Sequence, residues 1–410
     1  MTASVAPVSP AAPASHPLAA PLARTAVTLM FTVNGLLIGG WGGSLPSLRD
    51  KLAVSDGQIA LMLFLAGIAG ITSMQVGGRL SDVVGARRIA LVALPVLVAA
   101  VVTLGLADSY PVAVVGAALL GLGNGAMDVA MNAIGVQVEQ ARRRPVMSSF
   151  HAFFSIGNLL GAAAVLGLAA AFGLAGGAIV TPLLLTLAAV AVVVLVVLVR
   201  VAPTAAPVEH RDAEGGRIRI PRAAYVLGVM ALAFGLSEGT AVDWSSIHIT
   251  DVARVDPTTG AVGLVAVSGF MVVIRLFGDR LVTRFGRRAI VRFGGVSAAL
   301  GYLAVTLVSS LPLLVAGWAL VGLGVGMIAP QVYAVAGHLG GGRVLAVVVT
   351  FGYAAFLAGP AVIGFLVRHV GIHHAMAVPA VLCAGIVALA ATMPREDSDI
   401  SRRRETDPLA

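Results

Sequence analysis

Three polar side chains interrupt a long apolar run of this 410-residue chain. Asn124, Asp128 and Asn132 are spaced four residues apart, so on a helix they form one polar stripe about 12 Å long. A carboxylate facing lipid costs several kcal/mol, and we therefore expect the stripe to face a bundle interior or a watery cavity. Burial also favours the neutral form of an acid, which makes Asp128 the first candidate for a proton-coupling site. The alternative is a purely structural hydrogen bond to a neighbouring helix.

Two more acids lie in the apolar segment 223–249. Glu238 is expected about 22 Å along a helix, near mid-membrane, and is the second candidate for proton coupling. Asp243, beside Trp244, approaches the outer surface and points about 140° away from Glu238. A structural role remains open for Glu238, and an interfacial anchor is the alternative for Asp243 and Trp244.

His151 is a candidate proton relay, because the pKa of an ordinary histidine lies near physiological pH; an interhelical hydrogen bond is the alternative. Arg275 and Asp279, four residues apart, are expected to pair with each other or with loop residues. Neither a metal site nor a cofactor is expected. The candidate substrate contacts are Asn34, Trp41, Asn124, Asn132, Asp243, Trp244, Gln331 and Tyr333.

The composition is that of an integral membrane protein. Hydrophobic residues make up 58% of the chain and charged residues only 11%, and apolar runs of about 20 residues, enough to cross a bilayer, recur throughout. The net charge of +8 resides in short loops without interleaved aromatic residues, which argues against nucleic acid binding. The sequence has no P-loop and no hydrolase motif, so neither ATP-driven transport nor enzymatic activity is expected.

The apolar runs predict an all-α protein with twelve transmembrane helices in two six-helix halves. The lysines and arginines favour cytoplasmic termini, since only four would lie outside (Arg49, Lys51, Arg254 and Arg368) and one within a helix (Arg275). The predicted spans are 25–46, 58–78, 89–107, 111–137, 146–173, 176–201, 223–249, 259–279, 288–308, 311–337, 343–368 and 373–393. The predicted organisation is a disordered tail (1–24), a first half (25–202), a central cytoplasmic loop (203–222), a second half (223–393) and a cytoplasmic tail (394–410).

The two halves carry an internal repeat. GGRLSDVVGARR, residues 77–88, has its counterpart in GDRLVTRFGRR, residues 278–288, and LGLGNG at 120–125 recurs as VGLGVG at the same separation along the chain. Two motifs at one separation indicate duplication of a six-helix unit, which is typical of secondary transporters. The residues of this predicted conformational motif are Gly77, Gly78, Asp82, Gly85, Arg87, Arg88, Gly278 and Gly286.

The loop GGRLSDVVGARR resembles the signature loop of the major facilitator superfamily. That resemblance implies a central cavity lined by the first, fourth, seventh and tenth spans. The segments GNGAMDVAMNAIGVQVE, RPVMSSFHAFFSIG and LSEGTAVDWS are similar to a bacterial branch, the YbjJ-like transporters. The pattern around Asp128 also resembles that of the fucose/proton symporters, which have Glu at this position; their first-span acid falls near Gly42.

We therefore expect a monomeric, proton-coupled secondary transporter of a small polar solute, sugar-like or another metabolite, in the bacterial cytoplasmic membrane. Its partners would be the solute, protons and the lipid bilayer. An exporter of drugs or metabolites is the first alternative, although the Gly-Pro-rich motif of family antiporters is absent from the fifth span. A non-transporting membrane receptor is the alternative of another class.

Overall fold

The computed structural model describes residues 18, 20–142, 146–203 and 220–393. The predicted tails 1–24 and 394–410 and the central loop 203–222 lie wholly or largely outside the described residues. The end of the predicted tail 1–24 is helical, because α1 (Pro21–Leu52) begins at Pro21. A proline suits the first turn of a helix, since the N–H that it lacks would have no partner there.

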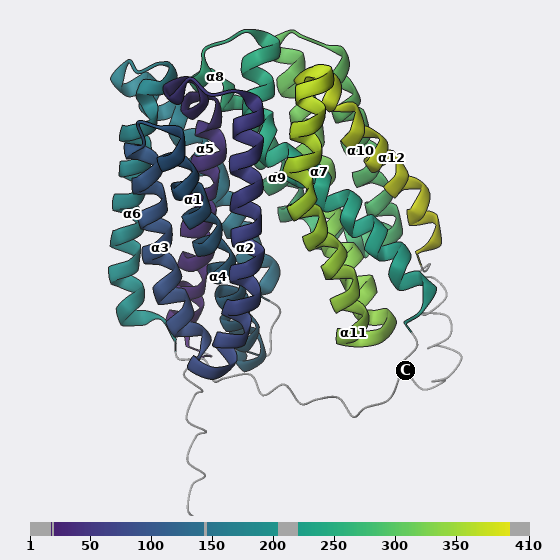
Figure 1. Ribbon diagram of the computed structural model, residues 1–410. Helices are drawn as coiled ribbons and strands as arrows, with labels where there is room; N and C mark the ends of the chain where they lie inside the picture. Colours follow the sequence, from purple (N-terminus) through teal and green to yellow (C-terminus); the bar gives the residue numbers. More distant parts are fainter. Residues whose placement is uncertain (1–17, 19, 143–145, 204–219, 394–410) are drawn as a thin grey trace, which may run out of the picture.

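The first half is a bundle of antiparallel helices (Figure 1). We call the end of the bundle at which α1 begins the proximal face, and the end at which α1 finishes and α2 begins the distal face. A capping box at Ser55 and Gln58 starts α2 at the distal face. The other elements of this half are α2 (Asp56–Val84), α3 (Ala86–Leu106), α4 (Tyr110–Arg142), α5 (Met147–Phe172), the 3-10 turn η2 (Gly176–Ile179) and α6 (Val180–Val201).

The second half repeats the arrangement with one departure, in α11. Its elements are α7 (Arg222–Ala253), α8 (Pro257–Gly260), α9 (Val262–Phe285), α10 (Arg287–Leu307), α11 (Leu311–Ala375), α12 (Ala377–Leu389) and the 3-10 turn η3 (Ala390–Thr392).

Helix α11 replaces two predicted spans and the loop between them. Its 65 residues would measure about 98 Å if straight, roughly three times the hydrocarbon thickness. A Cβ built on Gly352 would lie 2.7 Å from the Tyr333 hydroxyl, so α11 doubles back on itself. Residues 338–342, predicted to be a loop, are helical in the structure. No proline lies between Pro330 and Pro360, so no backbone N–H is missing from this stretch of the helix.

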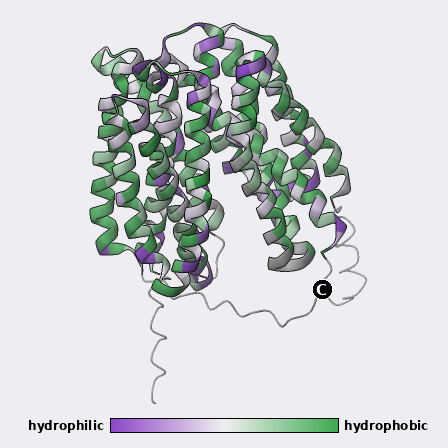
Figure 2. Ribbon diagram, viewed as in Figure 1, coloured by the Kyte–Doolittle hydropathy of each residue, from purple (hydrophilic) through white to green (hydrophobic). Residues whose placement is uncertain are grey.

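Ten helices of the described chain are long and apolar enough to cross a membrane, and up to eleven if the segments Ala358–Ala375 and Ala377–Thr392, bent by 73°, form one span. The predicted all-α membrane fold is therefore confirmed. The difference from twelve separate spans lies at the C-terminal end, where α12 has only 13 residues. Figure 2 shows hydrophobic residues along the visible helices, as expected of a surface solvated by lipid.

Glycines bring α1 and α5 into backbone contact. A Cβ on Gly39 would lie 2.0 Å from the Asn158 carbonyl oxygen, and one on Gly161 would lie 2.1 Å from the Leu36 carbonyl oxygen. Small residues four apart allow such close packing in membranes, where apolar burial does not drive helices together. The contact fixes the polar side chains of α5 relative to α1.

The two halves converge at the distal face and spread apart toward the proximal face (Figure 1). The hydrogen bonds described between the halves lie between the distal face and mid-depth, and join α1 to α7, η2 to the start of α8, and α5 to α9. This arrangement is that of a two-half transporter closed at its distal end.

Candidate functional site: a polar network at mid-depth

A half-buried ion pair occupies the middle of the second half. Arg275 Nη2 on α9 lies 3.4 Å from Glu238 Oε1 on α7, and the two side chains are 18% and 19% exposed. The Arg275 Nε donates to the Gly326 carbonyl oxygen at 3.1 Å. Removal of either charge would leave the other uncompensated inside the bundle, which is costly.

The same arginine joins the two halves. Its Nη1 donates to Ser155 Oγ on α5, and Ser155 Oγ in turn donates to the His151 carbonyl oxygen at 3.1 Å. Close to this link, Ser268 Oγ on α9 donates to Asn158 Oδ1 on α5 at 3.1 Å. A guanidinium therefore connects an acid of one half with a hydroxyl of the other half.

The structure gives Arg275 a partner that the sequence analysis did not predict. The structure pairs Arg275 with Glu238 rather than with a loop residue, and the side chain of Asp279 lies outside the described part. One signal could have identified this pair: Glu238 and Arg275 each lie about 20 Å from the distal end of their helices, so they share one depth.

Asp128 belongs to a separate network on α4. Asn132 Nδ2 donates to the backbone carbonyl oxygen of Asp128 at 2.8 Å and to the carboxyl Oδ1 of Asp128 at 3.2 Å, contacts that a four-residue spacing on a helix allows. Both side chains are half-buried, as is Asn124. No basic side chain lies within ion-pair distance of Asp128 in the described chain, so this carboxyl has an amide partner but no countercharge.

Two expected candidates border these networks. Asn34 on α1 is buried, with Nδ2 4.0 Å from Met131 Sδ one turn from Asp128, and its Oδ1 has no partner among the described residues. His151 is exposed, and its ring makes an edge contact with Phe31 at 5.1 Å. The structure thus brings Asn34 beside the α4 stripe and His151 beside the arginine link.

Asp243 is half-buried, and a Cβ on Gly239, one turn away on α7, would meet open space. Trp41 and Trp244 are instead buried in protein contacts and do not lie at the molecular surface. Asp243 is therefore not fully enclosed by protein, and the two tryptophans are packing residues in this conformation.

The two candidates on α11 lie toward the proximal face. Gln331 is buried, and its Oε1 accepts a hydrogen bond from Arg287 at 2.9 Å. Tyr333 is half-buried and lies against Gly352. In this conformation the side-chain amide oxygen of Gln331 accepts from Arg287, which lies in the second copy of the repeated motif.

The distal face is closed by charged groups that the sequence did not single out. The two Arg49 Nη atoms at the end of α1 donate to the two carboxylate oxygens of Asp251 on α7, and Nη1 also pairs with Asp56. Bidentate arginine–carboxylate pairs of this kind are directional and strong. We call the Arg49–Asp251 pair the distal latch.

A second distal contact joins η2 to the residue before α8. Asp256 Oδ1 accepts from the Gly176 N–H at 3.3 Å and from the Thr258 N–H and hydroxyl at 2.9 and 2.6 Å. Burial alone would raise the pKa of Asp256, but the bonds from Thr258 and Gly176 outweigh it and hold that pKa below its ordinary value. The carboxylate is therefore kept ionised.

The repeated motif has the same backbone conformation in both halves. Gly85 and Gly286 adopt φ of 89° and 75°, which favour glycine, at the α2–α3 and α9–α10 turns. Arg87 donates to the Val199 and Ala202 carbonyl oxygens, each at 2.8 Å, and so caps the C-terminal end of α6.

The other motif residues occupy these same helix ends. The side chain of Asp82 lies outside the described part. A Cβ added at Gly77 or Gly78 would make only ordinary van der Waals contacts, whereas one at Gly278 would lie 3.0 Å from Met327 Sδ; Arg88 is exposed. A small side chain therefore fits at Gly77 and Gly78, and the packing is tighter at Gly278.

Comparison with known proteins agrees with this architecture. The family model described as Major Facilitator Superfamily matches residues 27–339 and 225–409. The uncharacterized transporter y4wD of Sinorhizobium fredii is 35% identical over 350 residues, which cover 82% of this chain and 89% of that protein. An Arabidopsis thaliana protein named as a polyol transporter is 30% identical over 130 residues, 32% of this chain and 25% of that protein.

Among solved structures, a mutant of the nucleoside transporter NupG matches with a TM-score of 0.71 at 11% identity. The match covers 90% of this chain and 98% of that chain, and at this identity it shows a common fold. Because the family model spans most of the sequence and a relative above 30% identity spans most of its length, the chain belongs to the Major Facilitator Superfamily.

Proposed function

We propose that this chain imports a small polar solute together with protons by alternating access. The observation that carries the proposal is the half-buried carboxyl of Asp128, which has an amide partner but no basic one within the described chain. An uncompensated carboxylate at mid-depth is costly, and binding of a proton removes that cost. Glu238 is the second candidate, because its pairing with Arg275 allows exchange between a salt bridge and a protonated acid.

The proposed substrate carries hydroxyl groups, as a sugar or polyol does. Amide side chains supply both hydrogen-bond donors and acceptors, which suits the recognition of hydroxyl groups. Asn124 and Asn132 belong to the α4 stripe, and Asn34 lies beside it. The partial relative named as a polyol transporter supports the same class. The span-four pattern, with its similarity to the fucose/proton symporters and to the YbjJ-like branch, is consistent with symport.

The proposed orientation directs the distal face outward. Both chain ends and the arginine-rich motif loops then lie in the cytoplasm, as the positive-inside rule favours. The multi-pass chain has bacterial relatives, and we assign it to the bacterial cytoplasmic membrane as a monomer. The conformation described above is then closed to the outside.

Transport assays in proteoliposomes with an imposed pH gradient test the proposal. Asp128→Asn preserves size and hydrogen bonding but cannot release a proton. We expect its accumulation ratio for the transported sugar or polyol to fall to about one, while exchange of internal for external substrate persists. Glu238→Gln is the matched control, since it neutralises the other mid-depth acid.

Three outcomes would overturn parts of the assignment. Undiminished accumulation by Asp128→Asn would eliminate this residue as the coupling site, and loss in Glu238→Gln alone would transfer the role to α7. Accumulation driven by a sodium gradient in the absence of a pH gradient would show that sodium, and not the proton, is the coupling ion.

A further inference from the structure

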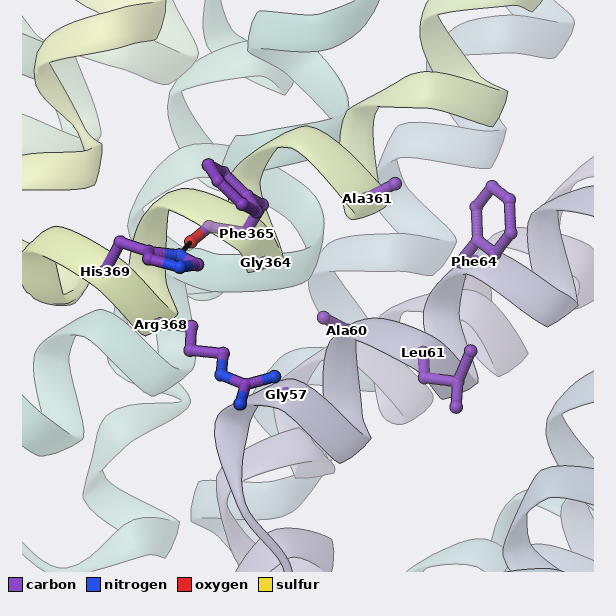
Figure 3. A pocket seen from close by; sticks show the side chains of 9 residues that line it. All are labelled: Gly57, Ala60, Leu61, Phe64, Ala361, Gly364, Phe365, Arg368 and His369. Carbon is purple, nitrogen blue, oxygen red and sulfur yellow. Dashed lines mark hydrogen bonds between the residues drawn. The ribbon is translucent and has the colours of Figure 1, made fainter.

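A groove runs along the membrane-facing surface where the two halves meet. It encloses about 470 Å³ between α2 and the C-terminal leg of α11 (Figure 3). This volume lies within the range of about 300 to 1,000 Å³ typical of ligand pockets. We call it the α2–α11 groove, and its lining residues are Gly57, Ala60, Leu61, Phe64, Ala361, Gly364, Phe365, Arg368 and His369.

The walls of the groove are apolar and remain uncovered by protein. Leu61 is 48% exposed and Phe365 is 63% exposed. The floor is formed where α2 and α11 touch, at Ala60 and Gly364, which are both buried. Since this surface belongs to helices that span the bilayer, a hydrocarbon chain is the ligand whose chemistry matches these walls.

The distal end of the groove is cationic. Arg368 is exposed, and Figure 3 shows its side chain extending from α11 toward Gly57 at the start of α2. It lies about 10 Å along the helix from Ala375, the last residue of α11, and we expect lipid headgroups near this end of the helices. No carboxylate of the described chain lies within ion-pair distance of Arg368, and the neighbouring acid Asp56 is paired with Arg49.

His369 completes this end of the groove. Its ring lies 4.1 Å from that of Phe365, and its Nδ1 is 2.7 Å from the Phe365 carbonyl oxygen. That contact holds the imidazole against the apolar wall and leaves Nε2 as its other polar atom. The groove thus combines a cationic head region with an apolar channel.

We propose that the α2–α11 groove binds one phospholipid with an anionic headgroup, its phosphate at Arg368 and an acyl chain along Leu61, Phe64 and Phe365. The charge of Arg368 favours a net negative headgroup over a zwitterionic one. The apolar walls distinguish a lipid from a free phosphate ion, which would bind to the arginine alone. This site is distinct from the transport network at mid-depth.

The lipid would contact both halves at once. Its binding energy is available only while α2 and α11 lie together, so an anionic lipid in the outer leaflet favours the state closed at the distal face. The lipid composition of the membrane would therefore set the resting balance between the two states of the transporter.

Native mass spectrometry of the full chain measures this binding directly. The probes are phosphatidylglycerol, which is anionic, and phosphatidylethanolamine of equal chain length, which is zwitterionic. We expect phosphatidylglycerol to bind more tightly, and Arg368→Gln to weaken it about fivefold, the factor that corresponds to about 1 kcal/mol for one cationic residue near a membrane surface. Arg254→Gln, the same charge change at the distal face away from the groove, should leave binding unchanged.

A second variant separates the acyl channel from the charge. Ala361→Phe adds a ring within the exposed groove while Arg368 stays in place, and we expect it to reduce lipid binding with no change in thermal stability. Equal binding of the two lipids, equal loss in Arg254→Gln, or displacement of phosphatidylglycerol by millimolar inorganic phosphate would each overturn the proposal. Full lipid binding by Ala361→Phe would also overturn it. If Ala361→Phe fails to fold, Arg368→Gln still decides the test.

Discussion

Gly364→Ala should shift the transporter toward the state open at the distal face. The added Cβ would lie 2.1 Å from Ala60 Cβ, whereas carbon atoms in contact prefer about 3.5 to 4.0 Å. Helices α2 and α11 would have to separate by roughly 1.5 to 2 Å, and such overpacking costs about 1 to 3 kcal/mol. If the clash exists only while the distal face is closed, the equilibrium between the two states moves by about 5- to 150-fold.

Distances between spin labels across the distal face measure this shift. Asp108 and Ser309 lie in exposed turns of opposite halves and accept cysteine substitution, and the native Cys383 is buried. We expect the long-distance population to increase in Gly364→Ala. Gly359→Ala is the matched control on the same helix, because a Cβ there meets nothing within 4 Å.

The result that would refute this reasoning is an unchanged distance distribution in a folded Gly364→Ala protein. Such a result would mean that α2 and α11 absorb the methyl group without separating, so that Ala60 does not oppose closure. A similar shift in Gly359→Ala would point to a general effect of alanine on α11 rather than to the contact with Ala60.

Three further predictions follow from the charged groups. Arg49→Asp should favour the state open at the distal face, and the added change Asp251→Arg should restore the closed population, as measured by the same spin labels. Asp256→Asn should leave the transport pH profile unaltered between pH 5 and 8, because a lowered pKa keeps the carboxylate ionised there and its contribution is lost only as the pH falls below about 3.9. Arg275→Gln should lower the melting temperature by leaving Glu238 uncompensated, and Arg275→Gln with Glu238→Gln should recover most of it; equal melting temperatures for the two variants would contradict this.

Local geometry explains the part of the site that could be predicted from the sequence. Residues four apart on a helix are neighbours, which predicted that Asn124, Asp128 and Asn132 share one stripe, and the hydrogen bond between Asn132 and Asp128 follows from that spacing. The positive φ of Gly85 and Gly286 likewise follows from their place in a repeated turn. These features need no knowledge of which helices touch.

The pairing of Arg275 with Glu238 does not follow from this local rule. The acid lies on a different helix of the bundle, and the ion pair offsets the cost of placing a charged Glu238 side chain inside the membrane. The distal latch could not be predicted for a related reason. In the sequence, Arg49 and Asp251 are ordinary charged residues near helix ends, and only the fold places them in contact. The path of α11 also depends on tertiary contacts, such as that of Gly352 with Tyr333.

The depths of the contacts between the halves constrain how the transporter can open. Arg49 holds Asp251 at the distal face, whereas Arg275 holds Ser155 at mid-depth. Separation of the halves at the distal end must break both contacts, so neither alone determines the barrier. The distal contact involves charged groups at the end of the bundle, whereas the mid-depth contact involves the guanidinium that also pairs with Glu238. A change at Glu238, whether protonation or replacement by a solute group, therefore alters the strength with which Arg275 holds the other half, and this links the chemistry of the site to the position of the helices.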